Sequence, residues 1–87
     1  MTTDIRILGP GCYRCQALYE NTLLAVSELG LDAEVQKVED IREMLSRGIM
    51  YPPALVVDDQ LVMSGDVPNP SRVGELLSEF LASRTEG

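Results

Sequence analysis

The chain has 87 residues, of which 45% are hydrophobic and 24% are charged, and its formal net charge is −7 at pH 7 with no histidine. This composition is typical of one globular domain and excludes an intrinsically disordered chain. The excess of acidic residues argues against nucleic acid and against an anionic membrane as partners, because both would repel the chain.

The N-terminal residues lead into a short strand. Met1-Thr2-Thr3-Asp4 has neither the basic start nor the apolar stretch of a signal peptide, and no apolar run reaches the length of a membrane helix. We therefore expect a cytoplasmic protein. Ile5–Leu8 has the pattern of a strand, and Gly9-Pro10-Gly11 ends it.

Cys12 and Cys15 stand where this strand meets an amphipathic helix. In the first turn of a helix, residues three apart face the same side and lie within reach of a disulfide. A helix N-terminus carries about half a positive charge, which lowers the pKa of a thiol there from about 8.5 to between ~3.5 and ~7.5. Because the thiolate is the nucleophile in disulfide exchange, this position activates a cysteine.

Redox chemistry, metal binding and inert thiols are the three interpretations of this pair. Zinc needs four ligands, usually Cys or His, and the chain has two cysteines and no histidine. Metal binding would therefore involve a soft ion such as Cu(I), or a site shared across a dimer. A disulfide that closes a four-residue loop adds only about 2 kcal/mol to the free energy of unfolding, which argues against a structural role. The residues favour redox chemistry.

The middle of the chain predicts a helix, a strand and a second, short helix. The helical period continues from Cys15 to Leu29, and Gly30 fits the left-handed position that follows a helix. Ala33–Val38 is β-prone with mixed polarity, as expected near the edge of a sheet. The short helix begins with a possible capping box and ends at a glycine; these residues are Asp40, Glu43 and Gly48.

The last third predicts a hairpin and a final helix. Ala54–Val57 and Leu61–Ser64 have the pattern of strands, joined by a solvated turn at Asp58-Asp59-Gln60. Asn69 or Ser71 caps the final helix. Its apolar stripe consists of Val73, Leu76, Leu77, Phe80 and Leu81.

This order predicts an α/β fold with the arrangement βαβαββα and a four-stranded mixed sheet flanked by three helices. The first three elements form a βαβ unit with two parallel strands, and the hairpin adds antiparallel strands. We expect a single domain over residues 1–87, with a core from about residue 4 to residue 83 and a frayed tail at 84–87.

The predicted order, with Cys-x-x-Cys at the first strand–helix junction, resembles the thioredoxin superfamily. Its small, glutaredoxin-sized branch of redox-active disulfide proteins is the most similar. The resemblance covers residues 5–81 and rests on Leu8-Gly9-Pro10-Gly11-Cys12-Tyr13-Arg14-Cys15, Pro52-Pro53-Ala54-Leu55-Val56-Val57 and Ser64-Gly65. It implies a thioredoxin-like fold and a thiol–disulfide oxidoreductase that needs no cofactor. The expected partners are disulfide-containing substrates and a reductase, and we expect a monomer.

The resemblance also implies residue roles. Cys12 corresponds to the nucleophile, Cys15 to the resolving cysteine, and Pro53 to the cis-proline beside the disulfide. The expected substrate groove consists of Gly11, Tyr13, Arg14, Tyr51, Pro52 and Gly65. Arg14 either favours the thiolate or is a solvated helix residue. Tyr13 either faces substrate or lies on the surface, and Tyr51 either lines the groove or packs against the sheet.

Two departures from the family pattern limit these expectations. Thioredoxins have a buried acid that assists proton transfer, and Arg6 stands at the corresponding position, which leaves that role empty. Pro52 has no N–H to pair with a peptide or with glutathione, so we expect glutathione to be a poor partner. The alternative functions are handling of a soft metal or metalloid by the same thiols, and a redox-regulated interaction module without turnover.

Overall fold

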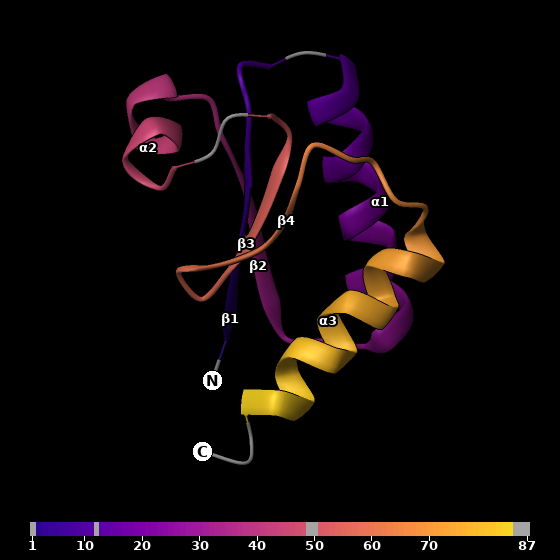
Figure 1. Ribbon diagram of the computed structural model, residues 1–87. Coiled ribbons are helices and arrows are strands. Elements are labelled where there is room, and N and C mark those ends of the chain that lie inside the picture. Colours follow the sequence, from indigo (N-terminus) through magenta and orange to yellow (C-terminus); the bar gives the residue numbers. More distant parts are fainter. Residues whose placement is uncertain (1, 12, 49–50, 85–87) are drawn as a thin grey trace.

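The computed structural model describes residues 2–11, 13–48 and 51–84 of the chain. Strands and helices follow one another in the predicted order (Figure 1). The elements are β1 (Thr3–Leu8), α1 (Tyr13–Leu29), β2 (Ala33–Val38), α2 (Ile41–Ser46), β3 (Ala54–Val57), β4 (Gln60–Ser64) and α3 (Pro70–Arg84). The predicted thioredoxin-like α/β fold class is confirmed.

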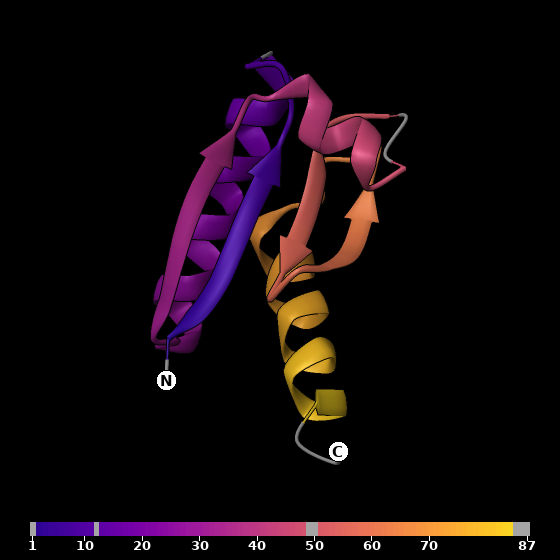
Figure 2. The same ribbon diagram turned by 90° about the vertical axis from the view of Figure 1, so that its left-hand side faces the viewer.

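The four strands form one mixed sheet in the order β2-β1-β3-β4. β1 and β2 are parallel, as a βαβ unit requires, while β3 is antiparallel to both β1 and β4. β2 lies at an edge, as its mixed polarity predicted. Helices α1 and α3 cover one face of the sheet and α2 covers part of the other, and the view from the α2 side shows the strands next to one another (Figures 1 and 2).

Two apolar clusters hold the layers together. The larger lies between the sheet and helices α1 and α3, and the smaller lies under α2. Strand β3 is buried at all four positions because it is central and covered on both faces. The larger cluster consists of Ile5, Ile7, Leu18, Ala25, Leu55, Val57, Val73 and Leu77. The smaller consists of Leu8, Met44, Ala54 and Val56.

Most helix ends follow the predicted signals. Gly30 has a φ of 65°, the left-handed conformation expected after α1. Asn69 caps α3, because its Oδ1 accepts a hydrogen bond from the N–H of Arg72 at 2.8 Å. The capping box is only half correct. Asp40 Oδ1 accepts from the N–H of Arg42 at 2.9 Å, whereas the carboxylate of Glu43 pairs with arginine side chains instead.

The β3–β4 turn is more than a solvated turn. Asp58 and Asp59 both have positive φ, 48° and 69°, which suits a two-residue hairpin. The carboxylate of Asp58 accepts from the N–H of Asp4 at 2.9 Å and so ties the turn to β1. Asp59 lies 2.8 Å from a guanidinium nitrogen of Arg47, and this hydrogen-bonded ion pair lowers the pKa of the Asp59 carboxyl.

The C-terminal end of the fold differs slightly from expectation. Helix α3 continues through Arg84, which is the first residue of the predicted tail at 84–87. Residues 85–87 lie outside the described residues. Within the described part of the chain, no helix has the length and apolar character needed to cross a membrane.

Candidate functional site

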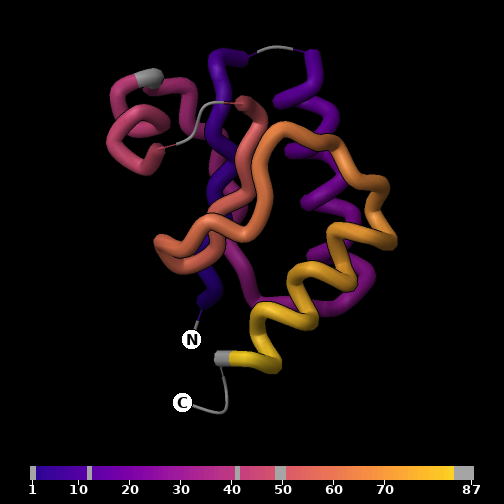
Figure 3. The backbone as a smooth tube through the Cα atoms, viewed as in Figure 1, coloured from indigo at the N-terminus to yellow at the C-terminus, as the bar shows by residue number. Residues whose placement is uncertain are grey.

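Three loops meet at the end of the sheet opposite the two chain termini (Figure 3). They are the β1–α1 loop, the segment before β3 and the segment after β4. Hydrogen bonds join them, because the N–H of Gly65 donates to the carbonyl of Pro53 at 2.9 Å and the carbonyl of Gly65 accepts from Arg14 at 2.9 Å. These three segments together contain most of the residues expected to form the groove.

Cys15 lies in the first turn of α1 and is only 4% exposed. It packs against Gly9 so closely that a Cβ at that position would overlap the sulfur. The same position lies 3.7 Å from the Cβ of Pro52. The space that a Gly9 side chain would occupy therefore adjoins both Cys15 and Pro52, and the absence of that side chain leaves room for the sulfur.

The proline loop has a distinctive geometry. The peptide bond between Pro52 and Pro53 is cis, and Pro53 is fully buried. Pro52 is half-buried, while Tyr51 is 70% exposed, so Tyr51 does not pack against the sheet. A Cβ on Gly65 would lie 3.2 Å from the Cβ of Tyr51, and Gly65 has a φ of 81°. Both observations favour glycine at position 65.

The remaining expected groove residues lie near the start of α1. Gly11 is exposed, with a φ of 85°. Tyr13 is 88% exposed, which agrees with either of its two interpretations. Arg14 is exposed but is not a simple solvated residue, because it donates to Gly65. Cys12, expected to be the nucleophile, lies outside the described residues.

A small cavity of about 50 Å³ opens beside Cys15. Its charged lining residues, Lys37 and Glu39, were not among the predicted site residues. In the observed register, Lys37 of β2 lies opposite Ile7 of β1, whose side chain faces α1. Because side chains alternate between the faces of a strand, knowledge of this register would have placed Lys37 on the α1 face as well. The lining residues are Ile7, Gly9, Gly11, Cys15, Gln16, Lys37 and Glu39.

Arg6 does not lie in this cavity. Its guanidinium pairs with Asp4 at 3.2 Å and with Glu43 of α2 at 3.3 Å. These contacts place the side chain on the face of the sheet that α2 covers, away from α1. The position that a buried acid occupies in thioredoxins therefore has a structural role here.

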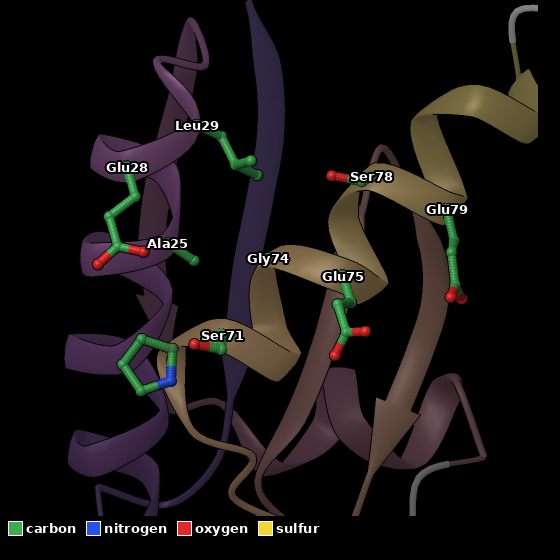
Figure 4. Close-up of a pocket in the computed structure, with 9 residues that line it drawn as sticks. Ala25, Glu28, Leu29, Ser71, Gly74, Glu75, Ser78 and Glu79 are labelled. Atoms are coloured by element: carbon green, nitrogen blue, oxygen red, sulfur yellow. The ribbon is translucent and has the colours of Figure 1, made fainter.

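A larger hollow of about 440 Å³ lies between the C-terminal half of α1 and helix α3 (Figure 4). It contains none of the predicted site residues, and its walls carry carboxylates and hydroxyls. Its lining residues are Ala25, Glu28, Leu29, Pro70, Ser71, Gly74, Glu75, Ser78 and Glu79. Across the described ranges, no group of three or more Cys, His, Asp or Glu residues is arranged to hold a metal ion.

The family model and the curated relatives that match this chain are all thioredoxins. A family model for the thioredoxin domain matches residues 3–78. A thioredoxin of Methanocaldococcus jannaschii is 39% identical over 80 residues, which cover 92% of this chain and 92% of the relative. A thioredoxin of Methanothermobacter thermautotrophicus is 39% identical over 74 residues, which cover 85% and 96% of the two chains. The solved structure of thioredoxin 1 from Thermosipho africanus superposes with a TM-score of 0.61 at 15% identity, covering 94% of this chain and 98% of that one.

Proposed function

The chain belongs to the thioredoxin family, and we propose that it acts as a thiol–disulfide oxidoreductase through Cys12 and Cys15. The observation that carries this proposal is the position of Cys15, buried in the first turn of α1 beside Gly9 and the Pro52–Pro53 loop. Cys12 precedes that helix, where the positive end of the helix dipole favours a thiolate. The first turn of α1 contains no acidic residue that would oppose this effect.

The exchange proceeds in two steps. The Cys12 thiolate attacks one sulfur of the substrate disulfide, which breaks the substrate S–S bond, releases one substrate thiolate and forms a mixed disulfide. Cys15, as a thiolate, then attacks the sulfur of Cys12, which forms the Cys12–Cys15 disulfide and releases the second substrate thiolate. The substrate gains two electrons and the protein loses two. A reductase returns them, so the cycle needs no bound cofactor.

The burial of Cys15 suits the second step. A thiol that is 4% exposed is poorly accessible to a large substrate but remains close to the preceding turn of its own chain. Pro53 is buried and, in this proposal, shapes the groove next to the disulfide. The rings of Tyr13 and Tyr51 are exposed and, in this proposal, offer apolar contacts to a protein substrate.

The setting that suits this chemistry is a reducing cytoplasm, where dithiols are kept reduced and disulfides are transient. The proposed unit is a monomer. A single domain is supported by the two apolar clusters, which draw on the same sheet. Its partners are disulfide-containing proteins and a reductase.

The test is reduction of a protein disulfide such as that of insulin, driven by a thioredoxin reductase, together with capture of cellular partners by a Cys15→Ser variant. The expected result is steady turnover by the wild-type protein and a set of mixed disulfides on the variant. Tight binding of a soft metal ion with no disulfide reduction would contradict the proposal and support the metal-handling alternative.

Glutathione is expected to be a weak substrate, and Pro52→Thr is expected to improve its binding. The backbone at this position has no N–H, and a missing hydrogen bond typically costs about 1–3 kcal/mol, or roughly 5–150-fold in affinity. The net charge of −7 adds repulsion of anionic glutathione. Threonine restores the donor. The measurement compares a glutathione-coupled assay with the reductase-driven assay for both proteins.

Pro68→Thr is the control for this prediction, because it also replaces a loop proline but lies in the β4–α3 segment, where its carbonyl accepts from Asn21. It should leave both assays unchanged. Rapid turnover of the wild-type protein with glutathione, or an unchanged affinity in Pro52→Thr, would show that the missing donor does not limit glutathione binding.

A further inference from the structure

Two of the residues that line the cavity beside Cys15 are glycines. A Cβ on Gly9 would overlap the sulfur of Cys15, and a Cβ on Gly11 would lie 2.5 Å from the Oε2 atom of Glu39. The β1–α1 loop thus has a glycine at each of the two positions, Gly9 and Gly11, that a reactive side chain approaches. One glycine accommodates a thiol and the other a carboxylate, and both groups line the same cavity.

The titratable residues that line the cavity are Cys15 from α1, Lys37 from β2, and Glu39 directly after β2. Lys37 is already engaged. Its ammonium donates to Gln16 Oε1 at 2.8 Å and lies 5.1 Å from the centre of the Tyr19 ring. A lysine ammonium donates hydrogen bonds and has no acceptor site. Among the described lining residues, Glu39 is the one carboxylate able to receive a proton.

We infer that Glu39 is the base that removes the proton from Cys15 in the resolving step, through water held in the cavity. This inference rests on the proposed function. A volume of about 50 Å³ exceeds the space that one water requires, and Glu39, Gln16, Lys37 and Cys15 provide polar partners for it. The base comes from the end of β2 because Arg6 of β1 is paired on the opposite face of the sheet.

The step balances as follows. The Cys15 thiol gives its proton through water to the Glu39 carboxylate, and the resulting thiolate attacks the sulfur of Cys12 in the mixed disulfide. The Cys12–Cys15 bond forms as the bond between Cys12 and the substrate breaks, and the substrate leaves as a thiolate. Glu39 then passes the proton to that thiolate or to solvent. A buried thiol loses its proton reluctantly, since its thiolate is poorly solvated, and this is the difficulty that a base relieves.

The test compares Glu39→Gln with Glu34→Gln, an exposed residue of β2 whose replacement changes the net charge equally. A mixed disulfide is prepared on Cys12 with a small thiol peptide, and its release is followed in a single turnover from about pH 6 to about pH 9. General base catalysis typically contributes 10²–10⁴-fold, and because the base here acts through water we expect a smaller, roughly 10-fold slowing in Glu39→Gln near neutral pH. The difference should narrow steadily toward about pH 9, because more of the Cys15 thiol ionises unaided as the pH rises.

Glu39 is exposed, so its replacement is not expected to affect folding, and thermal unfolding checks this. Glu39→Asp keeps the carboxylate but shortens its reach, and it should give an intermediate rate with the wild-type pH profile. Equal rates for Glu39→Gln and wild type, or a loss independent of pH, would overturn the assignment. Failure of the wild-type mixed disulfide to resolve at any pH would instead overturn the proposed function itself.

Discussion

Cys12→Ser should abolish disulfide reduction, with a fall of at least about 1,000-fold, whereas Cys15→Ser should stop after a single covalent capture. A serine hydroxyl is a poor nucleophile without an adjacent base, so Cys12→Ser removes the first step. Cys15→Ser leaves the first step intact and removes the second. Mass spectrometry of the intact protein should find a stable mixed disulfide on Cys15→Ser and none on Cys12→Ser.

The two single variants serve as controls for each other, because each loses one thiol of the same Cys-x-x-Cys pair. Alkylation of the reduced wild-type protein adds an independent measurement. Cys12 should react faster at neutral pH, since Cys15 is 4% exposed. A faster reaction at Cys15, or a mixed disulfide trapped on Cys12→Ser, would reverse the proposed roles.

The sequence predicted the fold because its signals are local and agree with one another. The apolar run Ala54–Val57 is too short for a helix and too apolar for an edge strand, and it forms the central strand, buried on both faces. Gly30 and Asn69 mark helix ends through contacts within a few residues. Such contacts are encoded next to the residues that use them.

The second half of the capping box at Asp40 was predicted wrongly, because a contact between residues far apart in the sequence replaces it. Its second half needs Glu43 to turn back toward the helix start, but Arg6 and Arg47 each come within 3.3 Å of the Glu43 carboxylate. Arg6 belongs to β1, which is 37 residues away along the chain. A tertiary ion pair thus replaced a local hydrogen bond, and a pattern of four residues could not have shown it.

The site was predicted in part for the same reason. The cysteines are only three positions apart in the sequence and were readily recognised, whereas the hydrogen bond between Arg14 and Gly65 joins residues 51 apart. Glu39 was missed because it enters the site only through the parallel pairing of β1 with β2, which brings Ile7 opposite Lys37. The close approach of Gly9 to Cys15 likewise depends on how α1 lies across the sheet.

Gly9→Ala should both destabilise the protein and impair disulfide exchange. The added methyl group would overlap the sulfur of Cys15 and lie 3.2 Å from its Cβ, so one of the two must move. The φ of Gly9 is not in the left-handed region, so the effect is steric and not a backbone penalty. Overpacking of this kind typically costs about 1–3 kcal/mol. Urea unfolding measures the loss, and single-turnover exchange measures the displacement of Cys15.

Gly74→Ala is the matched control, because it adds the same methyl group within α3, where the nearest atom is Leu29 Cδ1 at 3.9 Å. It should leave exchange unchanged and stabilise the helix by roughly 0.5–1 kcal/mol. The cause of the Gly9 effect can be isolated in a Cys15→Ala background, which removes the sulfur that the methyl group would meet. There, the cost of Gly9→Ala should fall by at least about half, a coupling that distant, independent sites do not show. An undiminished cost would mean that the methyl group clashes with Pro52 or the surrounding backbone, and that Gly9 does not position the resolving cysteine.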